Sequence, residues 1–419
     1  MSEMSYLEKL LDGVEVEWKT LEDISIKISS GGTPKTGVSE FYDGDIPWLR
    51  TQEVNFCDIW DTEVKITESG VKNSSAKWIP KNCVIVAMYG ATVGKIGINK
   101  IPMTTNQACA NIQLNEEVAH YRYVFHFLCS QYTYIKSLGT GSQTNINAQI
   151  VKNIKIPIPC PDNPEKSLAI QSEIVRILDK FTALTAELTA ELTAELTMRK
   201  KQYNDYRDQL LSFEQGEVEW KTLGEIAKIQ RGASPRPIAQ YMTDADDGIP
   251  WIKIGDTSPG SKYINGTAQK VTPDGAKKSR ILNPGDFVIS NSMSFGRPYI
   301  LSITGAIHDG WASISDFSER LDSDYLYHYL SSQRVKNYWG SKINSGSVSN
   351  LNADIIKTLP LPLPDIQKQK WIATLLDKFD TLTSSISEGI PREIELRQKQ
   401  YEYYRDLLFS FPKSEAASN

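Results

Sequence analysis

Several loops of this chain place a lysine or an arginine beside glycines and small hydrogen-bonding side chains. The first half contributes Ser30, Thr33, Lys35, Arg50, Thr92, Lys95, Gln143, Thr144 and Asn145, and the second contributes Arg231, Ser234, Arg236, Lys253, Ser294, Arg297, Ser347, Ser349 and Asn350. Lysine and arginine contact phosphates, whereas asparagine, glutamine and arginine can bridge base edges in the major groove of DNA. Glycine lets the backbone approach a ligand closely. These residue types therefore favour DNA contact.

A single loop cation is usually an ordinary solvated residue, so the hypothesis rests on recurrence. EVEWKTLEDI from Glu15 recurs as EVEWKTLGEI from Glu217, and GDIPWLR ending at Arg50 recurs as DGIPWIK ending at Lys253. GSQTNINAQIVKNIKIPIP in the first half recurs as GSVSNLNADIIKTLPLPLP in the second. Two copies of one unit therefore account for the whole chain.

Each copy has the composition of a globular head followed by a long helix. Short β-rich runs, a glycine turn with a cation and an aromatic helical run predict a mixed α and β head. The expected boundaries are 1–160 for the first head, 161–214 for the first helix, 215–364 for the second head and 365–419 for the second helix. The fold class is thus α+β, with two heads separated by a pair of long antiparallel helices and an internal pseudo-twofold repeat.

Two features stand where each head meets its helix. Alternate prolines occupy IPIPCP and LPLPLP, and because proline favours an extended chain, these runs are expected to be stiff linkers. In the polar loop just before, Asn145 and Asn350 are DNA-contact candidates. They equally suit the N-cap of the short helix that leads into the proline run, and both interpretations stay open.

The two long helices are predicted to pair along an apolar seam. Three tandem TAEL units set leucines every four residues, and the second helix repeats the apolar positions 198 residues later. The seam consists of Leu178, Phe181, Leu184, Leu188, Leu192 and Leu196 on the first helix and of Leu376, Phe379, Leu382, Ile386, Ile390 and Ile394 on the second. Pro391 predicts a kink or break in the second helix, because proline removes a helical hydrogen bond.

Composition sets outer bounds on the function. The chain has 419 residues, 40% of them hydrophobic and 23% charged, as in ordinary soluble proteins. It contains neither a transmembrane-length apolar run nor the features of a signal peptide. Its five cysteines, an odd number without a CxxC motif, indicate free thiols in a reducing cytoplasm. The net charge of −5 argues against nucleic acid as a partner, but phosphate binding is local.

Motifs for catalysis are not found, and no cofactor or metal is expected. GATVGKIG at 90–97 resembles a phosphate-binding loop, but its glycines are too close together and Lys95 is followed by Ile96 rather than by serine or threonine. We find no acidic-proline-aromatic tetrapeptide of an adenine methyltransferase, no GxSxG and no HExxH. A tight turn that presents one cation is the simpler interpretation of 90–97.

The alternation of two heads with two helices, the TAEL array and the paired LDKF and KQYxxYRD words resemble the specificity subunit (HsdS) of type I restriction-modification systems, and the TAEL units resemble its type IC branch. The resemblance implies a cytoplasmic, non-catalytic subunit whose heads are target recognition domains for the two halves of a split double-stranded DNA target. It further implies that the helix pair spaces the heads and docks two modification (methyltransferase) subunits, and that restriction subunits join the complex. In this family the number of TAEL units is tied to spacer length, so three units imply the longer spacer.

Two other functions stay open at this point. A DNA methyltransferase or nuclease with divergent motifs would bind S-adenosylmethionine or a metal by itself. A two-headed scaffold protein that does not bind DNA would select no sequence from a DNA pool, even with partner subunits present.

Overall fold

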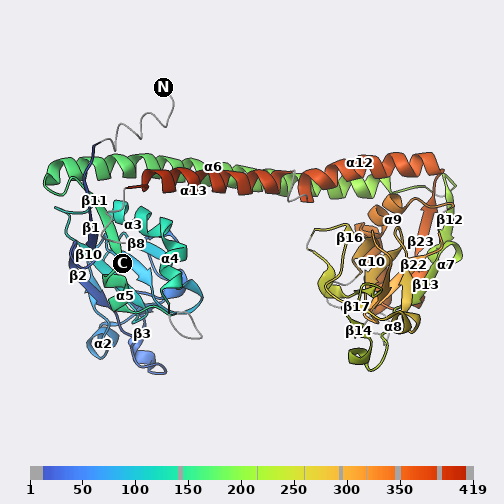
Figure 1. Ribbon diagram of the computed structural model, residues 1–419, viewed down its shortest axis with the longest axis horizontal. Helices are drawn as coiled ribbons and strands as arrows, with labels where there is room; N and C mark the ends of the chain where they lie inside the picture. The colour runs from blue at the N-terminus through green and yellow to red at the C-terminus, as the bar shows by residue number, and fades with distance from the viewer. Residues whose placement is uncertain are drawn as a thin grey trace. The chain divides into compact units, whose positions relative to one another are not determined.

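The computed structural model describes residues 13–139, 145–214, 216–258, 260–291, 296–317, 319–344, 351–384 and 389–411. The chain divides into two compact units, one of residues 1–188 with 396–419 and one of residues 189–395. Each unit holds one head together with stretches of the long helices (Figure 1).

The first head contains a pair of strands, two further sheets and short helices. The strand pair is β1 (Val16–Thr20) with β11 (Lys155–Pro159). The five-stranded sheet runs β2 (Ser25–Ser30), β10 (Cys109–Leu114), β7 (Val84–Ala87), β8 (Ile96–Asn99) and β4 (Cys57–Ile59). The four-stranded sheet runs β5 (Lys65–Ile66), β3 (Tyr42–Leu49), β9 (Met103–Thr105) and β6 (Trp78–Ile79). Helices α2 (Glu68–Lys72), α3 (Tyr121–Ser130), α4 (Tyr132–Ser137) and α5 (Ala148–Lys152) complete it.

The second head repeats this plan. The strand pair is β12 (Glu219–Thr222) with β23 (Pro360–Leu363). One sheet runs β13 (Lys228–Arg231), β22 (Trp311–Ser315), β19 (Phe287–Ser290), β20 (Pro298–Leu301) and β16 (Tyr263–Ile264). The other runs β14 (Met242–Thr243), β17 (Lys270–Val271), β15 (Ile249–Ile252), β21 (Gly305–Ile307) and β18 (Arg280–Leu282). Its helices are α7 (Leu223–Ile226), α8 (Pro273–Lys277), α9 (Ser323–Leu330), α10 (Gln333–Asn344) and α11 (Ala353–Lys357). The predicted pair of mixed α and β heads is confirmed.

The proline runs are strands, so the prediction of stiff linkers is wrong. Pro157 and Pro159 lie opposite Trp18 and Val16 in the β1–β11 pair. The backbone N–H of Cys160 donates to the carbonyl of Glu15, so the alternate, non-proline positions make the ladder bonds. A spacing of two places the prolines within each strand on the side that needs no donor, where proline is tolerated.

The long helices are α6 (Pro164–Leu210), α12 (Ile366–Ser384) and α13 (Ile390–Leu408). The second long helix is thus divided, as Pro391 predicted, and this proline sits in the first turn of α13, where a missing N–H costs little. In the first unit α6 lies beside α13, and the ring of Phe181 stacks on that of Tyr404 at 5.4 Å (Figure 1). In the second unit α6 lies beside α12, and Tyr206 stacks on Phe379 at 5.8 Å.

The predicted seam is fully buried at its first position on each helix and less buried further along. Leu178 and Leu376 are fully buried, but Leu184 is 59% and Leu382 39% exposed, so the prediction for these two is wrong. The physical reason is that both residues follow the buried leucine by two steps of three residues. Each such step falls roughly 60° short of a full helical turn, so two steps place the side chain roughly 120° from the buried face. The remaining described seam positions are half-buried: Phe181, Leu188, Leu192, Leu196, Phe379, Ile390 and Ile394. Ile386 lies outside the described residues.

The core of each head is completed by the end of the other copy's helix. Phe409, just after α13, lies 5.5 Å from Tyr123 and 5.4 Å from Phe127 on α3 of the first head. Leu211 and Phe213, just after α6, belong to the core of the second head. The two copies are therefore interlocked, and neither compact unit coincides with one sequence copy.

Within the described residues no helix is both long and apolar enough to cross a membrane. The five cysteines are free.

Candidate nucleic-acid interface

The glycine turns predicted from the sequence exist in both heads. Gly94, before β8, has φ +80°, and Gly296, before β20, has φ +72°. Residues with a side chain rarely adopt this left-handed backbone conformation, so both positions suit glycine. Each turn is followed at once by the candidate cation, Lys95 in the first head and Arg297 in the second.

The space around the two turns differs, which predicts different tolerance to substitution. A Cβ atom on Gly296 would lie 2.9 Å from the ring of Trp339, whereas one on Gly94 would lie 3.4 Å from the ring of Tyr132. We expect Gly296→Ala to destabilise the protein by about 2–3 kcal/mol and Gly94→Ala by about 1–2 kcal/mol. Urea unfolding of the two variants measures the difference. Equal losses of stability in the two variants would show that the ring of Trp339 moves aside at little cost.

The cation of each turn has partners of its own head. Lys95 Nζ donates to Asn55 Oδ1 at 2.8 Å and lies 6.0 Å from the ring of Phe56. Phe56 adopts φ +54° and is 39% exposed. Thr92, from the same turn, donates its hydroxyl to the carbonyl of Thr51. The sequence did not reveal Asn55 and Phe56, because they lie in a stretch without a counterpart in the second copy.

In the second head, Arg297 lies over the ring of Tyr299 at 5.2 Å. A guanidinium stacked in this way keeps its donors free to turn towards a ligand. The structure therefore brings a cation and an aromatic ring together beside both turns, with different residues in each head.

In each head, a polar side chain holds the loop that carries the first candidates. This residue lies just before β10 in the first head and just before β22 in the second. Thr33 donates to Gln107 in the first head. In the second head Ser234 donates to Asp309 at 2.9 Å, and the guanidinium of Arg236 lies 3.4 Å from the same carboxylate. Burial alone would raise the pKa of Asp309, but the hydrogen bond from Ser234 and the nearby His308 and Arg236 hold it below its usual value. Sequence reasoning missed Gln107 and Asp309.

The other residues of these loops lie close by in the chain. Arg231, at the end of β13, donates to the backbone carbonyl of Asp309 at 3.3 Å. Ser30 ends β2, and its side chain is exposed, as is that of Lys35. Three candidates therefore gather around the acidic residue Asp309, whereas the residue that holds the matching loop of the first head, Gln107, is neutral.

Arg50 and Lys253 occupy one structural position in the two heads. Each precedes a short 3-10 helix, η2 (Thr51–Glu53) or η5 (Ile254–Asp256), whose last acid accepts from the backbone N–H of the cation. Their side chains differ, because Arg50 pairs with Glu63 at 2.6 Å whereas Lys253 donates to the neutral Gln269 at 2.6 Å. Lys253 is therefore electrostatically better suited to a phosphate than Arg50.

The polar loops before the strands β11 and β23 are only partly described. Gln143, Thr144, Ser294, Ser347, Ser349 and Asn350 lie outside the described residues, and Asn145 is half-buried. The N-cap of α5 is Asn147, whose side chain accepts from Ile150, and the N-cap of α11 is Asn352. The alternative that Asn145 and Asn350 cap these helices is therefore wrong by two positions.

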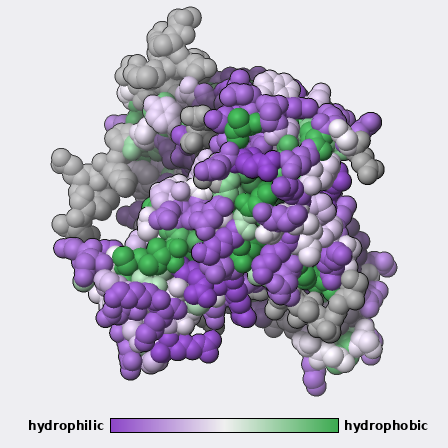
Figure 2. Space-filling model, turned by 90° about the vertical axis from the view of Figure 1, so that its right-hand side faces the viewer, coloured by the Kyte–Doolittle hydropathy of each residue, from purple (hydrophilic) through white to green (hydrophobic). Residues whose placement is uncertain are grey.

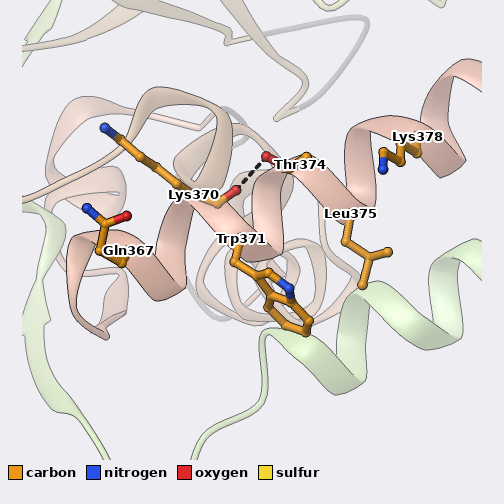
Figure 3. A pocket seen from close by; sticks show the side chains of 6 residues that line it. All are labelled: Gln367, Lys370, Trp371, Thr374, Leu375 and Lys378. Carbon is orange, nitrogen blue, oxygen red and sulfur yellow. Dashed lines mark hydrogen bonds between the residues drawn. The ribbon is translucent and has the colours of Figure 1, made fainter.

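The surface also offers an apolar feature away from these loops. The face in Figure 2 is mainly hydrophilic, with apolar atoms in separate small patches. On α12, Trp371 is 59% exposed and lines a shallow groove of about 360 Å³ with Lys370, Leu375 and Lys378 (Figure 3). The position of Trp371 in the first copy is occupied by Glu173, which pairs with Arg176. The groove is thus a feature of the second helix.

Comparison with known proteins agrees with this architecture. The family model of the type I restriction modification DNA specificity domain matches residues 13–198 and 216–396. The specificity subunit of the type I restriction enzyme EcoR124I/EcoR124II of Escherichia coli is 39% identical over the full length of both chains. The EcoprrI specificity subunit of the same organism is 37% identical over 93% of each chain.

Two solved structures share the fold. A chain of a type I restriction-modification system superposes with a TM-score of 0.69 at 17% identity, covering 94% of this chain and 97% of that one. The HsdS subunit from Thermoanaerobacter tengcongensis has a TM-score of 0.51 at 15% identity, covering 94% and 95%. The family model spans both copies and the E. coli relative spans the entire chain, so this protein belongs to the family of type I restriction modification DNA specificity domains.

Proposed function

We propose that this chain is the DNA-recognition subunit of a type I restriction-modification complex. Each head reads one half of a bipartite double-stranded target, and the long helices set the gap between the halves. The observation that supports this best is that one plan is used twice with different loop chemistry. Thr33 with Gln107 and Lys95 in the first head correspond to Ser234 with Asp309 and Arg297 in the second. Equal scaffolds with unequal loops suit two different half-sites.

The long helix has a length that suits a spacer. Helix α6 contains 47 residues, and a helix of that length is about 70 Å long. Two turns of B-DNA span a comparable distance, roughly 70 Å. None of the side chains of the TAEL units, residues 185–196, is fully buried, so the length of the helix can change without the loss of a buried core.

In this proposal the other subunits of the complex supply catalysis and much of the DNA-binding surface. We propose that the chain is non-catalytic and cytoplasmic, and that two modification subunits bind it and methylate the DNA, with restriction subunits joining through the complex. With a net charge of −5, the isolated chain should bind DNA weakly, and the modification subunits would provide much of the cationic surface.

Selection from a random pool of double-stranded DNA tests this function. The chain together with modification subunits should enrich a two-part sequence with one gap length. Calorimetry of the chain alone with S-adenosylmethionine should show no binding. If no sequence is enriched, the scaffold alternative is favoured. Tight binding of S-adenosylmethionine by the chain alone would favour an enzyme.

The groove around Trp371 is a candidate contact for a modification subunit. Tryptophan is enriched among the residues that anchor protein–protein interfaces, and Trp371 lies in this groove between Lys370 and Lys378. We expect Trp371→Glu to weaken binding of the modification subunits by about tenfold or more. Copurification and titration measure the loss, and Trp60→Glu, at an exposed tryptophan of the first head, serves as the matched control. Equal binding of both variants would exclude the groove.

A further inference from the structure

A network of charged groups joins the first head to its long helix. Asp179 of α6 accepts from Nε2 of the buried His126 at 2.7 Å and from the guanidinium of Arg122 at 2.7 and 2.8 Å. Both partners lie on α3. Arg122 also reaches Asp58 on β4 at 3.1 Å. Four side chains thus connect strand, head helix and long helix.

The second head contains a network with the same centre. Asp377 of α12, at the same position of the LDKF word as Asp179, accepts from Nε2 of the buried His328 at 2.8 Å and from Lys262 at 2.6 Å. Lys262, just before β16, also pairs with Asp324 on α9 at 2.6 Å. An aspartate on the long helix therefore holds a histidine and a cation of its own head in both units.

The two networks differ in which element supplies the cation. In the first head the cation Arg122 lies on the head helix and the outer acid Asp58 on a strand. In the second head the outer acid Asp324 lies on the head helix, and the cation Lys262 precedes a strand. In both heads an aspartate of the long helix thus binds a histidine and a cation. The head helix carries the cation in the first head but the outer acid in the second.

The chemistry of these groups suits an orienting role. Apolar burial is non-directional, whereas charge-assisted and bidentate hydrogen bonds specify a geometry. Burial alone would raise the pKa of Asp179, but the hydrogen bonds from His126 and Arg122 lower it to about 2. The same balance, with His328 and Lys262 as partners, lowers the pKa of Asp377. Both aspartates are therefore charged at neutral pH.

We propose that Asp179 and Asp377 are positioning residues that fix the angle of each head on its own long helix and thereby set how strictly the complex selects one gap length. This inference rests on the proposed function. It assigns no base contact to the networks. Loss of either network should leave both recognised half-sites unchanged and should allow the complex to bind targets with other gap lengths.

The experiment uses the full chain with modification subunits and DNA pools that hold the selected half-sites constant while the gap varies by one or two base pairs. We expect Asp179→Asn and Asp377→Asn each to raise the relative binding of gaps one base pair too long or too short by about tenfold, the ratio that corresponds to one charge-assisted hydrogen bond. Glu187→Gln, at an exposed acid of the same helix α6, should bind as the original protein does.

Further variants separate orientation from mere stability. Arg122→Gln withdraws the cation and should relax the gap. Arg122→Lys keeps the charge but not the bidentate contact, so it should restore part of the selectivity. Aspartate and Arg122→Gln variants that keep the narrow gap preference, even where thermal unfolding shows them destabilised, would overturn the inference. If the original protein itself selects no two-part sequence, the proposed function fails instead.

Discussion

Deletion of one TAEL unit, residues 189–192, is expected to shorten the gap between the half-sites by about one or two base pairs while both half-sites stay the same. Four residues contribute about 6 Å to a helix, and one base-pair step is about 3.4 Å. The deletion also changes the phase of the helix by about 40°. The deleted side chains are exposed or half-buried, so the cores of the two units should be preserved.

Selection of DNA sequences by the deletion variant measures this effect. A matched control replaces residues 189–192 by Ala-Ala-Glu-Ala, which keeps the helix length and helix propensity while it removes the repeat motif. The control should keep the original gap. An unchanged gap after the deletion, or a change in either half-site, would show that α6 does not set the spacing.

Truncation of Trp339 should have the largest effect on stability. This side chain of α10 is fully buried in the core of the second head, and its ring lies against the Gly296 turn that precedes Arg297. Replacing a buried aromatic residue by alanine removes apolar contact and leaves a cavity, at a cost of about 3–5 kcal/mol. We expect Trp339→Ala to lower the free energy of unfolding of the second head by that amount and to weaken recognition of one half-site only.

Hydrogen exchange resolved along the chain distinguishes the two heads in this experiment. Protection should fall in the second head and stay largely unchanged in the first. Trp60→Ala, at a tryptophan that is 65% exposed, provides the control and should change stability by no more than about 0.5 kcal/mol. Equal loss of protection in both heads would show that the interlocked cores unfold as one unit.

The sequence was sufficient for the plan of the fold, because the evidence for it is periodic. The recurrence of whole words predicted two heads of one type, and Pro391 predicted the division of the second long helix. The alternate prolines were misread, because the pattern of an extended strand and that of a stiff linker are the same until the partner strand is known. Leu184 was misplaced because two steps of three residues from the buried Leu178 carry it roughly 120° around the helix.

The candidate site was less predictable than the fold. Loop cations such as Lys95 can be found from their neighbours in the sequence, but Asp309 contacts Ser234 from a position far along the chain. The aspartates of the two LDKF words were visible as repeated residues, yet their histidine partners became apparent only once α3 and α9 were placed against the long helices. Contacts that join distant segments leave no local periodicity for sequence reasoning to detect.

The most direct test is a map of methylated bases across the genome of cells that express this chain with modification subunits. Two separate reading heads at a set spacing predict a two-part motif in which every methylated site has the same gap. A single continuous motif, or the same two halves at variable distances, would contradict it.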